Sequence, residues 1–284
     1  MTPVTTAEST TAETTSVAHE MARLKTGLRA MWMEGDYDRF SRYMEGTARE
    51  IYERLDIAPG SRLLDVACGG GQLALIAARE GVLVTGVDIA PNLVARAAAR
   101  ARGEGLRARF VEGDAEDLPF EDASFDVVTS VVGAMFAPRP ERVAAELLRV
   151  CAPGGTIAMA NWTAEGFVGR MFKTISSYIA PPGMPSPLLW GNEAKVTERL
   201  GAGSSDLSLT RRMYLFDYPF PPEEVVEFFA RYCGPTHRAF ATLDDPARGR
   251  LRQDLVALWS GANEAGDGVT VVKAEYLEVV AQRR

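Results

Sequence analysis

The 284-residue sequence is poor in the residue types that most often bind metal ions or form disulfides. It has three cysteines, Cys68, Cys151 and Cys233, and two histidines, His19 and His237. Three scattered cysteines do not build a disulfide framework, and they favour a reducing, cytoplasmic location. No CxxC, HxxxH or HExxH spacing occurs. We therefore expect no metal site.

Long apolar runs and an excess of positive charge are also lacking. No apolar run approaches the ~20 residues that a membrane-spanning helix needs, and the N-terminus has neither the basic start nor the apolar stretch of a secretory signal. Acidic residues outnumber basic residues by 38 to 31, for a net charge of −7. General binders of nucleic acid usually carry the opposite balance. We therefore predict no membrane contact and no general nucleic-acid binding.

The composition is that of a folded globular protein, with 46% hydrophobic and 24% charged residues. Residues 1–17 are rich in threonine and lack apolar periodicity, so we expect a disordered tail there. Apolar residues at helical spacing predict N-terminal helices over 18–58. Residues 59–161 alternate between strand and helix patterns. Residues 162–284 are expected to add lid helices and the last two strands.

Short apolar strand patterns recur along the chain with helical patterns between them. The predicted strands are Arg62–Ala67, Val82–Asp88, Arg109–Glu112, Phe125–Val132, Thr156–Ala160, Leu207–Tyr218 and Thr270–Val280. Such alternation predicts an α/β fold with a mostly parallel sheet and helices on both faces. Ligands of these sheets bind at the carboxyl ends of the strands.

The motif most indicative of a binding site is LLDVACGGGQ, from Leu63 to Gln72. Asp65 ends a predicted strand, and three glycines follow close behind it. Glycine lets a ligand approach the backbone and allows positive φ, and the free N–H groups of the next helix favour an anionic group. An ordinary glycine-rich turn is the simpler alternative.

Two further acids follow neighbouring predicted strands. Asp88 lies in VTGVDI and closes the second predicted strand. A carboxylate at this place can accept hydrogen bonds from both hydroxyls of a ribose. The alternative is an acid that caps the helix beginning at Pro91. Asp114 lies in EGDAEDLPF, where its carboxylate can accept from an adenine amino group while Ala115 offers a backbone N–H. The alternative there is an acidic surface turn.

Taken together and in this order, the motifs resemble those of the class I S-adenosylmethionine-dependent methyltransferases that act on small molecules. The stretches FDVVTSVVGAMFAP and LLRVCAPGGTIAMANW resemble the fourth-strand and fifth-strand blocks of that family. The resemblance implies a Rossmann-like seven-stranded sheet with an antiparallel last strand, S-adenosylmethionine as cofactor, and a small, aromatic or apolar acceptor. It leaves the oligomeric state open.

The resemblance also implies which residues contact the cofactor. They are Tyr37, Asp65, Ala67, Gly69, Gly71, Gln72, Asp88, Ile89, Asp114, Ala115, Ser130 and Val131. The segment around Trp32 and Tyr37 would lie over the methionine end, where an aromatic face suits a cation.

The remaining expectations concern the acceptor. Met135, Phe136, Trp162 and Trp190 are candidates for the wall of an apolar substrate cavity. His237 follows an expected turn at Gly234-Pro235 in the lid. It is the only histidine in the region expected to fold, so it is the candidate general base for a protonated nucleophile. Packing, or exposure in the lid for His237, is the alternative for each of them.

Three other functions compete with methyl transfer to a small molecule. Gly69, Gly71 and Ala74 also fit the G-x-G-x-x-A pattern of a nicotinamide-dependent dehydrogenase, which by itself is a weak signal. A methyltransferase-fold protein that binds the cofactor without methylating, as a cyclase or an accessory protein, is the second alternative, because the sequence has no compelling general base. A nucleic-acid methyltransferase fits less well because of the acidic balance.

Overall fold

The computed structural model describes residues 7–181, 183–266 and 268–284, with side chains from residue 19 onward. Seven strands form one sheet: β1 (Arg62–Val66), β2 (Leu83–Asp88), β3 (Ala108–Glu112), β4 (Phe125–Val131), β5 (Cys151–Trp162), β6 (Ser204–Tyr218) and β7 (Thr270–Arg283). Their order across the sheet is β3-β2-β1-β4-β5-β7-β6.

The sheet is mostly parallel. Strands β1 to β5 pair in parallel, and β7 pairs antiparallel with both β5 and β6. The predicted Rossmann-like fold with an antiparallel last strand is therefore confirmed. Strands β2 and β3 lie on one side of β1, and β4 and β5 lie on the other, so the order of the strands reverses between β1 and β4. In such sheets the carboxyl ends of the two strands at this point form the crevice where ligands bind.

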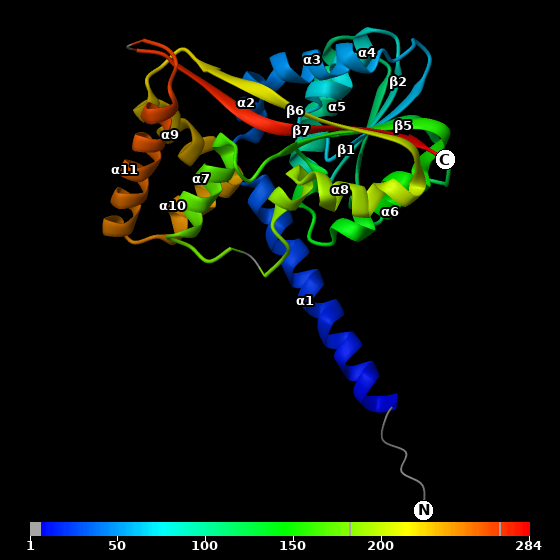
Figure 1. Ribbon diagram of the computed structural model, residues 1–284, viewed down its shortest axis with the longest axis horizontal. Helices are drawn as coiled ribbons and strands as arrows, with labels where there is room; N and C mark the ends of the chain where they lie inside the picture. The colour runs from blue at the N-terminus through cyan, green and yellow to red at the C-terminus, as the bar shows by residue number, and fades with distance from the viewer. Residues whose placement is uncertain (1–6, 182, 267) are drawn as a thin grey trace, which may run out of the picture.

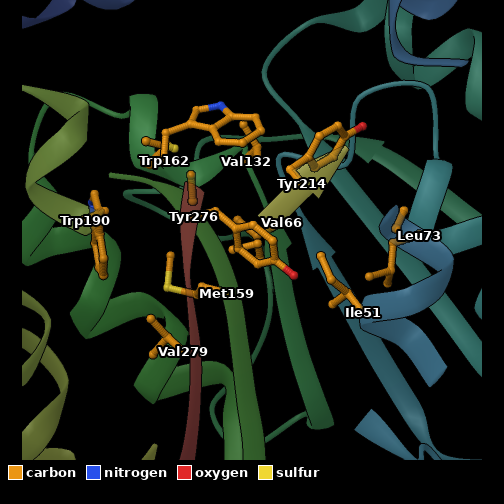
Figure 2. Close-up of a cluster of buried hydrophobic side chains, with 14 of the residues drawn as sticks. Ile51, Val66, Leu73, Val132, Met159, Trp162, Trp190, Tyr214, Tyr276 and Val279 are labelled. Carbon is orange, nitrogen blue, oxygen red and sulfur yellow. The ribbon is translucent and has the colours of Figure 1, made fainter. Parts of the chain in front are cut away.

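Helices cover both faces of the sheet (Figure 1). One layer contains α3 (Glu45–Leu55), α4 (Gln72–Arg79) and α5 (Pro91–Gly103), and the other contains α6 (Pro140–Val150) and α8 (Glu193–Leu200). Apolar residues that face inward from these helices meet strand residues such as Val66 and Met159 in one continuous core (Figure 2). Burial of this apolar surface is the main source of the fold's stability.

The remaining helices come from the N-terminal part of the chain and from the segments that follow β5 and β6. Helix α1 (Ala7–Met33) leads into α2 (Tyr37–Ser41), while α7 (Phe167–Ser176), α9 (Pro222–Tyr232), α10 (Gly234–Thr242) and α11 (Asp245–Ala262) form a cap beside the extended ends of β6 and β7 (Figure 1). No helix in the described part of the chain is both long and apolar enough to cross a membrane.

The structure differs from the sequence-based prediction in three places. The tail expected over 1–17 is helical from Ala7 onward, and residues 1–6 lie outside the described residues. Strand β5 begins at Cys151 rather than Thr156, with a register shift in its pairing to β4. The turn expected at Gly234-Pro235 instead starts α10, because proline suits the first turn of a helix.

Candidate functional site

A cavity that is partly open to solvent, with about 720 Å³ of empty space including that open part, lies at the carboxyl ends of β1, β2 and β4. It is lined by Lys25, Leu28, Trp32, Tyr37, Ala67, Gly69, Val87, Asp88, Ile89, Leu93, Gly113, Asp114, Ala115, Val132, Gly133, Ala134, Phe136, Ala137 and Pro138. Seven predicted cofactor residues thus border one space, as the strand order requires.

The glycine-rich loop after β1 follows an unusual backbone path. Ala67, Gly69 and Gly71 have φ values of 55°, 54° and 84°, and the Cys68 N–H donates to the Val87 carbonyl of β2 at 3.1 Å. Left-handed backbone costs alanine free energy that glycine does not pay, so the strain at Ala67 is held by the surrounding structure. The loop presents the backbone of residues 67 and 69 to the cavity.

Gly71 plays a structural part in this loop. It precedes α4 and does not line the cavity; a Cβ at this position would lie 3.2 Å from the Cβ of Ala97 and 3.3 Å from the ring of Phe110. The glycine therefore allows α4 to pack closely beside α5 and β3. The structure gives no support for the predicted cofactor contact of Gly71.

Asp88 is held in position by the backbone around it. Its Oδ2 accepts from the Gly69 N–H at 2.8 Å and its Oδ1 accepts from the Ala90 N–H at 2.9 Å. The side chain is buried, and burial raises its pKa although these N–H groups oppose the shift. Each oxygen keeps a lone pair, so a fixed acceptor faces the cavity next to Ile89. The two interpretations of Asp88, as a cap and as a ligand contact, are compatible.

The third acid is fixed in a similar way. Asp114 Oδ1 accepts from the Glu116 N–H at 2.9 Å, and its Oδ2 pairs with the ammonium of Lys25 from α1. Ala115 lies beside it at the cavity wall. The ion pair with Lys25 was missed by the sequence analysis, because 89 residues separate the partners.

A second cavity of about 500 Å³ shares Tyr37, Ala67, Gly69 and Val132 with the first. Asp65, Gln72 and Val131 line only this second cavity. Asp65 accepts from the Thr129 hydroxyl at 3.0 Å, and burial raises its pKa to about 7. The Gln72 amide donates to Ser41 of α2.

The loop after β4 closes tightly against the glycine-rich loop. Val132 has a φ of 51°, and a Cβ on Gly133 would lie 2.6 Å from the carbonyl oxygen of Ala67. The Ser130 hydroxyl donates to the Val66 carbonyl at 2.8 Å and accepts from the Ala134 N–H at 2.9 Å. Ser130, which lines neither cavity, therefore joins the two loops, and a direct cofactor contact by this side chain is not supported.

Aromatic rings enclose the region between the two cavities. The ring of Trp32 lies 5.3 Å from that of Tyr37 and 5.1 Å from that of Phe136, both edge-on. Burial raises the pKa of the Tyr37 hydroxyl, so this side chain stays neutral. Trp32, Tyr37 and Phe136, which were predicted to lie at the site, thus form an uncharged wall of the first cavity.

The other predicted substrate residues lie in the core and line neither cavity. Met135 is buried beside the site, and Trp162 packs on Tyr214 and Phe216. Trp190 lies under Arg199, whose guanidinium carbon is 4.7 Å from the ring centroid. Figure 2 shows Trp162 and Trp190 among the buried side chains. Their packing role, named above as the alternative, is the one that the geometry supports.

His237 has a local structural role as well. Its Nδ1 lies 2.9 Å from the Ala230 carbonyl near the end of α9, and the residue lines neither cavity. The expectation of a general base at His237 therefore has no geometric support. Among the described residues, no group of three or more His, Cys, Asp or Glu side chains could hold a metal ion.

Comparison with known proteins identifies the family. Residues 64–159 match the family model described as "Methyltransferase domain". The chain is 39% identical over 272 residues to the uncharacterized protein Rv1405c of Mycobacterium tuberculosis, covering 94% of this chain and 98% of that protein. The chain therefore belongs to the same family as Rv1405c over almost its whole length, and its residues 64–159 form a methyltransferase domain of the class I S-adenosylmethionine-dependent fold.

Solved structures confirm the fold. The YcgJ protein of Bacillus subtilis superposes with a TM-score of 0.59 at 18% identity, covering 84% of this chain and 98% of that one. The [4+2]-cyclase SpnF gives a TM-score of 0.52 at 22% identity, covering 84% and 80%.

A solved structure with this fold, phosphoethanolamine N-methyltransferase 2 of Haemonchus contortus, was determined in complex with S-adenosyl-L-methionine; it gives a TM-score of 0.54 at 19% identity, covering 84% of this chain and 53% of that one. The polar and aromatic groups of the two cavities fit this cofactor. Fixed carboxylates with free lone pairs at Asp88 and Asp114 match hydroxyl and amino donors. The uncharged aromatic rings of Trp32, Tyr37 and Phe136 match a sulfonium.

Proposed function

We propose that the protein transfers the methyl group of S-adenosylmethionine to a small acceptor with an aromatic or apolar body. The observation that carries the proposal is the pair of cavities that meet at Tyr37, Ala67, Gly69 and Val132. Asp88 and Asp114 line the first cavity, Asp65 lines the second, and Tyr37 lines both. When bound, the cofactor supplies an activated methyl group on a positively charged sulfur.

In this arrangement the adenosine lies in the first cavity. Asp88 accepts from the ribose hydroxyls, and Asp114 with Ala115 contacts the adenine edge. Both carboxylates are anchored by backbone N–H groups before any ligand arrives. Fixed groups of this kind bind well because little conformational freedom is lost on binding.

The amino-acid end of the cofactor lies in the second cavity. Asp65 and Gln72 line only this space, as do the hydroxyl-bearing side chains of Ser41 and Tyr214. Ionised Asp65 would accept a hydrogen bond from the cofactor's ammonium group. Tyr37, which lines both cavities, and the rings of Trp32 and Phe136, which line the first, would hold the sulfonium.

The main task of the chain is to align and enclose the reactants. Positioning of two reactants in a dry site can supply ~7–11 kcal/mol of a reaction barrier. Tyr37 stays neutral, because burial raises its pKa, and the cavity linings contain no histidine. We therefore infer an acceptor that is nucleophilic by itself, such as an amine, or an acidic phenol or enol.

The test is methyl transfer itself. Purified protein incubated with S-adenosylmethionine and a panel of phenols, enols and amines is expected to add one methyl group to a member of the panel, measured by mass spectrometry. Loss of the product in Asp88→Asn would assign the activity to this site.

A second candidate function is a cofactor-dependent reaction without methyl transfer, such as a cyclisation. The absence of a histidine base from the cavity linings favours it, and a cyclase is among the proteins with this fold. Tight binding of S-adenosylhomocysteine, together with no gain of a methyl group by any acceptor, would favour it. The matched methyltransferase model argues against the dehydrogenase alternative.

A further inference from the structure

One face of α1 forms a wall of the first cavity. Lys25, Leu28 and Trp32 follow one another at spacings of three and four residues, so they lie on the same side of the helix, and all three line the cavity. The opposite wall comes from the ends of β1, β2 and β4. A ligand that fills this space is therefore in contact with α1 on one side.

A buried carboxylate fastens this helix. The Lys25 ammonium pairs with Glu116 at 2.5 Å and also with Asp114. The Glu116 side chain is 0% exposed. It also accepts from the backbone N–H of Arg139 at 2.7 Å and from its Nε at 2.6 Å. Glu116 thus joins α1, the loop after β3 and the segment before α6.

The same helix offers a second ion pair for comparison. Arg29, one turn further along, pairs with Glu112 at 2.7 Å, but these side chains are 43% and 47% exposed. Water and salt screen such a pair, so it contributes little. Lys25 is only 18% exposed, and a poorly hydrated pair of opposite charges interacts more strongly.

We propose that Lys25 is a positioning residue that latches α1 over the bound cofactor through Asp114 and Glu116, and so sets the rate at which the cofactor leaves. This inference rests on the proposed placement of the adenosine in the first cavity. The latch uses Asp114, the same carboxylate that is proposed to face the adenine. Closure of α1 and recognition of the cofactor are thereby coupled.

Removal of Lys25 should open the latch and spare the fold. In Lys25→Met, Glu116 keeps both hydrogen bonds from Arg139, so no buried carboxylate loses its last partner. Asp114 keeps the N–H of residue 116. Methionine also retains the length and the apolar stem of the lysine side chain.

Stopped-flow binding of S-adenosylhomocysteine to the full-length protein tests the latch. We expect dissociation at least tenfold faster in Lys25→Met, with association not slowed, and dissociation within threefold of the original rate in Lys25→Arg. Arg29→Met is the matched control and should change dissociation by less than twofold. The ligand-free urea midpoints of both methionine variants should agree.

Glu116→Gln provides a second variant that weakens the same ion pair from the other side, and we expect faster dissociation there too. Unchanged or slower dissociation in Lys25→Met, or an equal effect of Arg29→Met, would overturn the latch. If Asp88→Asn weakens binding while the dissociation rate in Lys25→Met is unchanged, the latch is overturned and the proposed function is not. No binding by the unsubstituted protein would overturn the proposed function as well.

Discussion

The strand ends of β1, β2 and β4 and the C-terminal cap are built on opposite principles. At the strand ends, glycines, fixed acids and left-handed residues such as Ala67 and Val132 keep space open. In the cap, aromatic rings fill the space: Trp259 lies 4.5 Å from Phe167, 5.1 Å from Phe229 and 5.6 Å from Phe216, measured between ring centroids. The aromatic richness of the C-terminal region therefore builds a core, and the binding site depends on a few polar and glycine residues.

The largest expected effect separates stability from binding. Trp259 is 1% exposed and packs against four other aromatic rings. Replacement by alanine leaves a large cavity, which typically costs about 3–5 kcal/mol. We expect Trp259→Ala to lower the free energy of unfolding by that amount in urea titrations. Affinity for S-adenosylhomocysteine, measured well below the unfolding temperature, should change less than threefold; a large loss would show that the two regions are not separable.

The second effect is expected on binding rather than on stability. Asp88→Asn keeps the shape of the side chain but removes its charge and half of its acceptor capacity. Hydrogen bonds to charged groups contribute about 1.5–3 kcal/mol, so the dissociation constant for S-adenosylhomocysteine should rise roughly 10–150-fold in calorimetric titrations.

Asp126 provides the matched control for Asp88. It is a strand aspartate at the other end of β4, where it pairs with Arg62 at the surface. Asp126→Asn should leave the affinity unchanged. Equal losses in both variants would contradict the location of the site.

The third prediction concerns pH. Burial raises the pKa of Asp65 to about 7 in the folded protein, against 3.8 for an unperturbed carboxyl group. If the ionised form binds the cofactor's ammonium, affinity should fall below pH 7 by up to about tenfold per pH unit. The free energy of unfolding should change with pH in the opposite direction. The stabilisation that comes from the raised pKa of Asp65 is fully present below pH 3.8 and is lost as pH rises through about 7.

Calorimetry with S-adenosylhomocysteine between pH 6 and pH 8 measures the effect on binding. Asp65→Asn should abolish this pH dependence. A slope that persists in Asp65→Asn would assign the titration to another group.

The smallest expected effect tests the strained loop. Ala67 has a φ of 55°, and glycine adopts this conformation without the steric cost, which is roughly 1–2 kcal/mol for an L-residue. Glycine also gains entropy in the unfolded chain. Ala67→Gly should therefore stabilise the protein slightly, by less than about 1 kcal/mol in thermal unfolding. Destabilisation would show that the methyl group of Ala67 packs usefully against Gly133.

Short motifs allowed more of the site than of the C-terminal cap to be predicted. Asp65, Asp88 and Asp114 each lie at or near the carboxyl end of a predicted strand, so the rule that these ends meet at one edge of the sheet was enough to predict that they lie close together. For Ser130 and Gly71 the motif predicted that the residue lies near the site. Both residues, however, contact neighbouring segments of the protein and not the cavities.

Long-range contacts limited the rest of the prediction. The Lys25–Glu116 pair joins a terminal helix to a loop 91 positions further along the chain, and no local pattern marks such a contact. Trp190 and Trp162 resembled cavity walls because a sequence does not tell buried aromatic packing from a pocket. The β5 start and α10 were missed because Pro and Gly residues were interpreted as turns.

A crystal structure of the protein with S-adenosylhomocysteine would show whether the ligand occupies the two cavities at the carboxyl ends of β1, β2 and β4. We expect the ribose hydroxyls on the Asp88 carboxylate, the adenine beside Asp114 beneath α1, and the sulfur next to Trp32 and Tyr37. A ligand found elsewhere on the sheet, or one whose ribose does not contact Asp88, would contradict it.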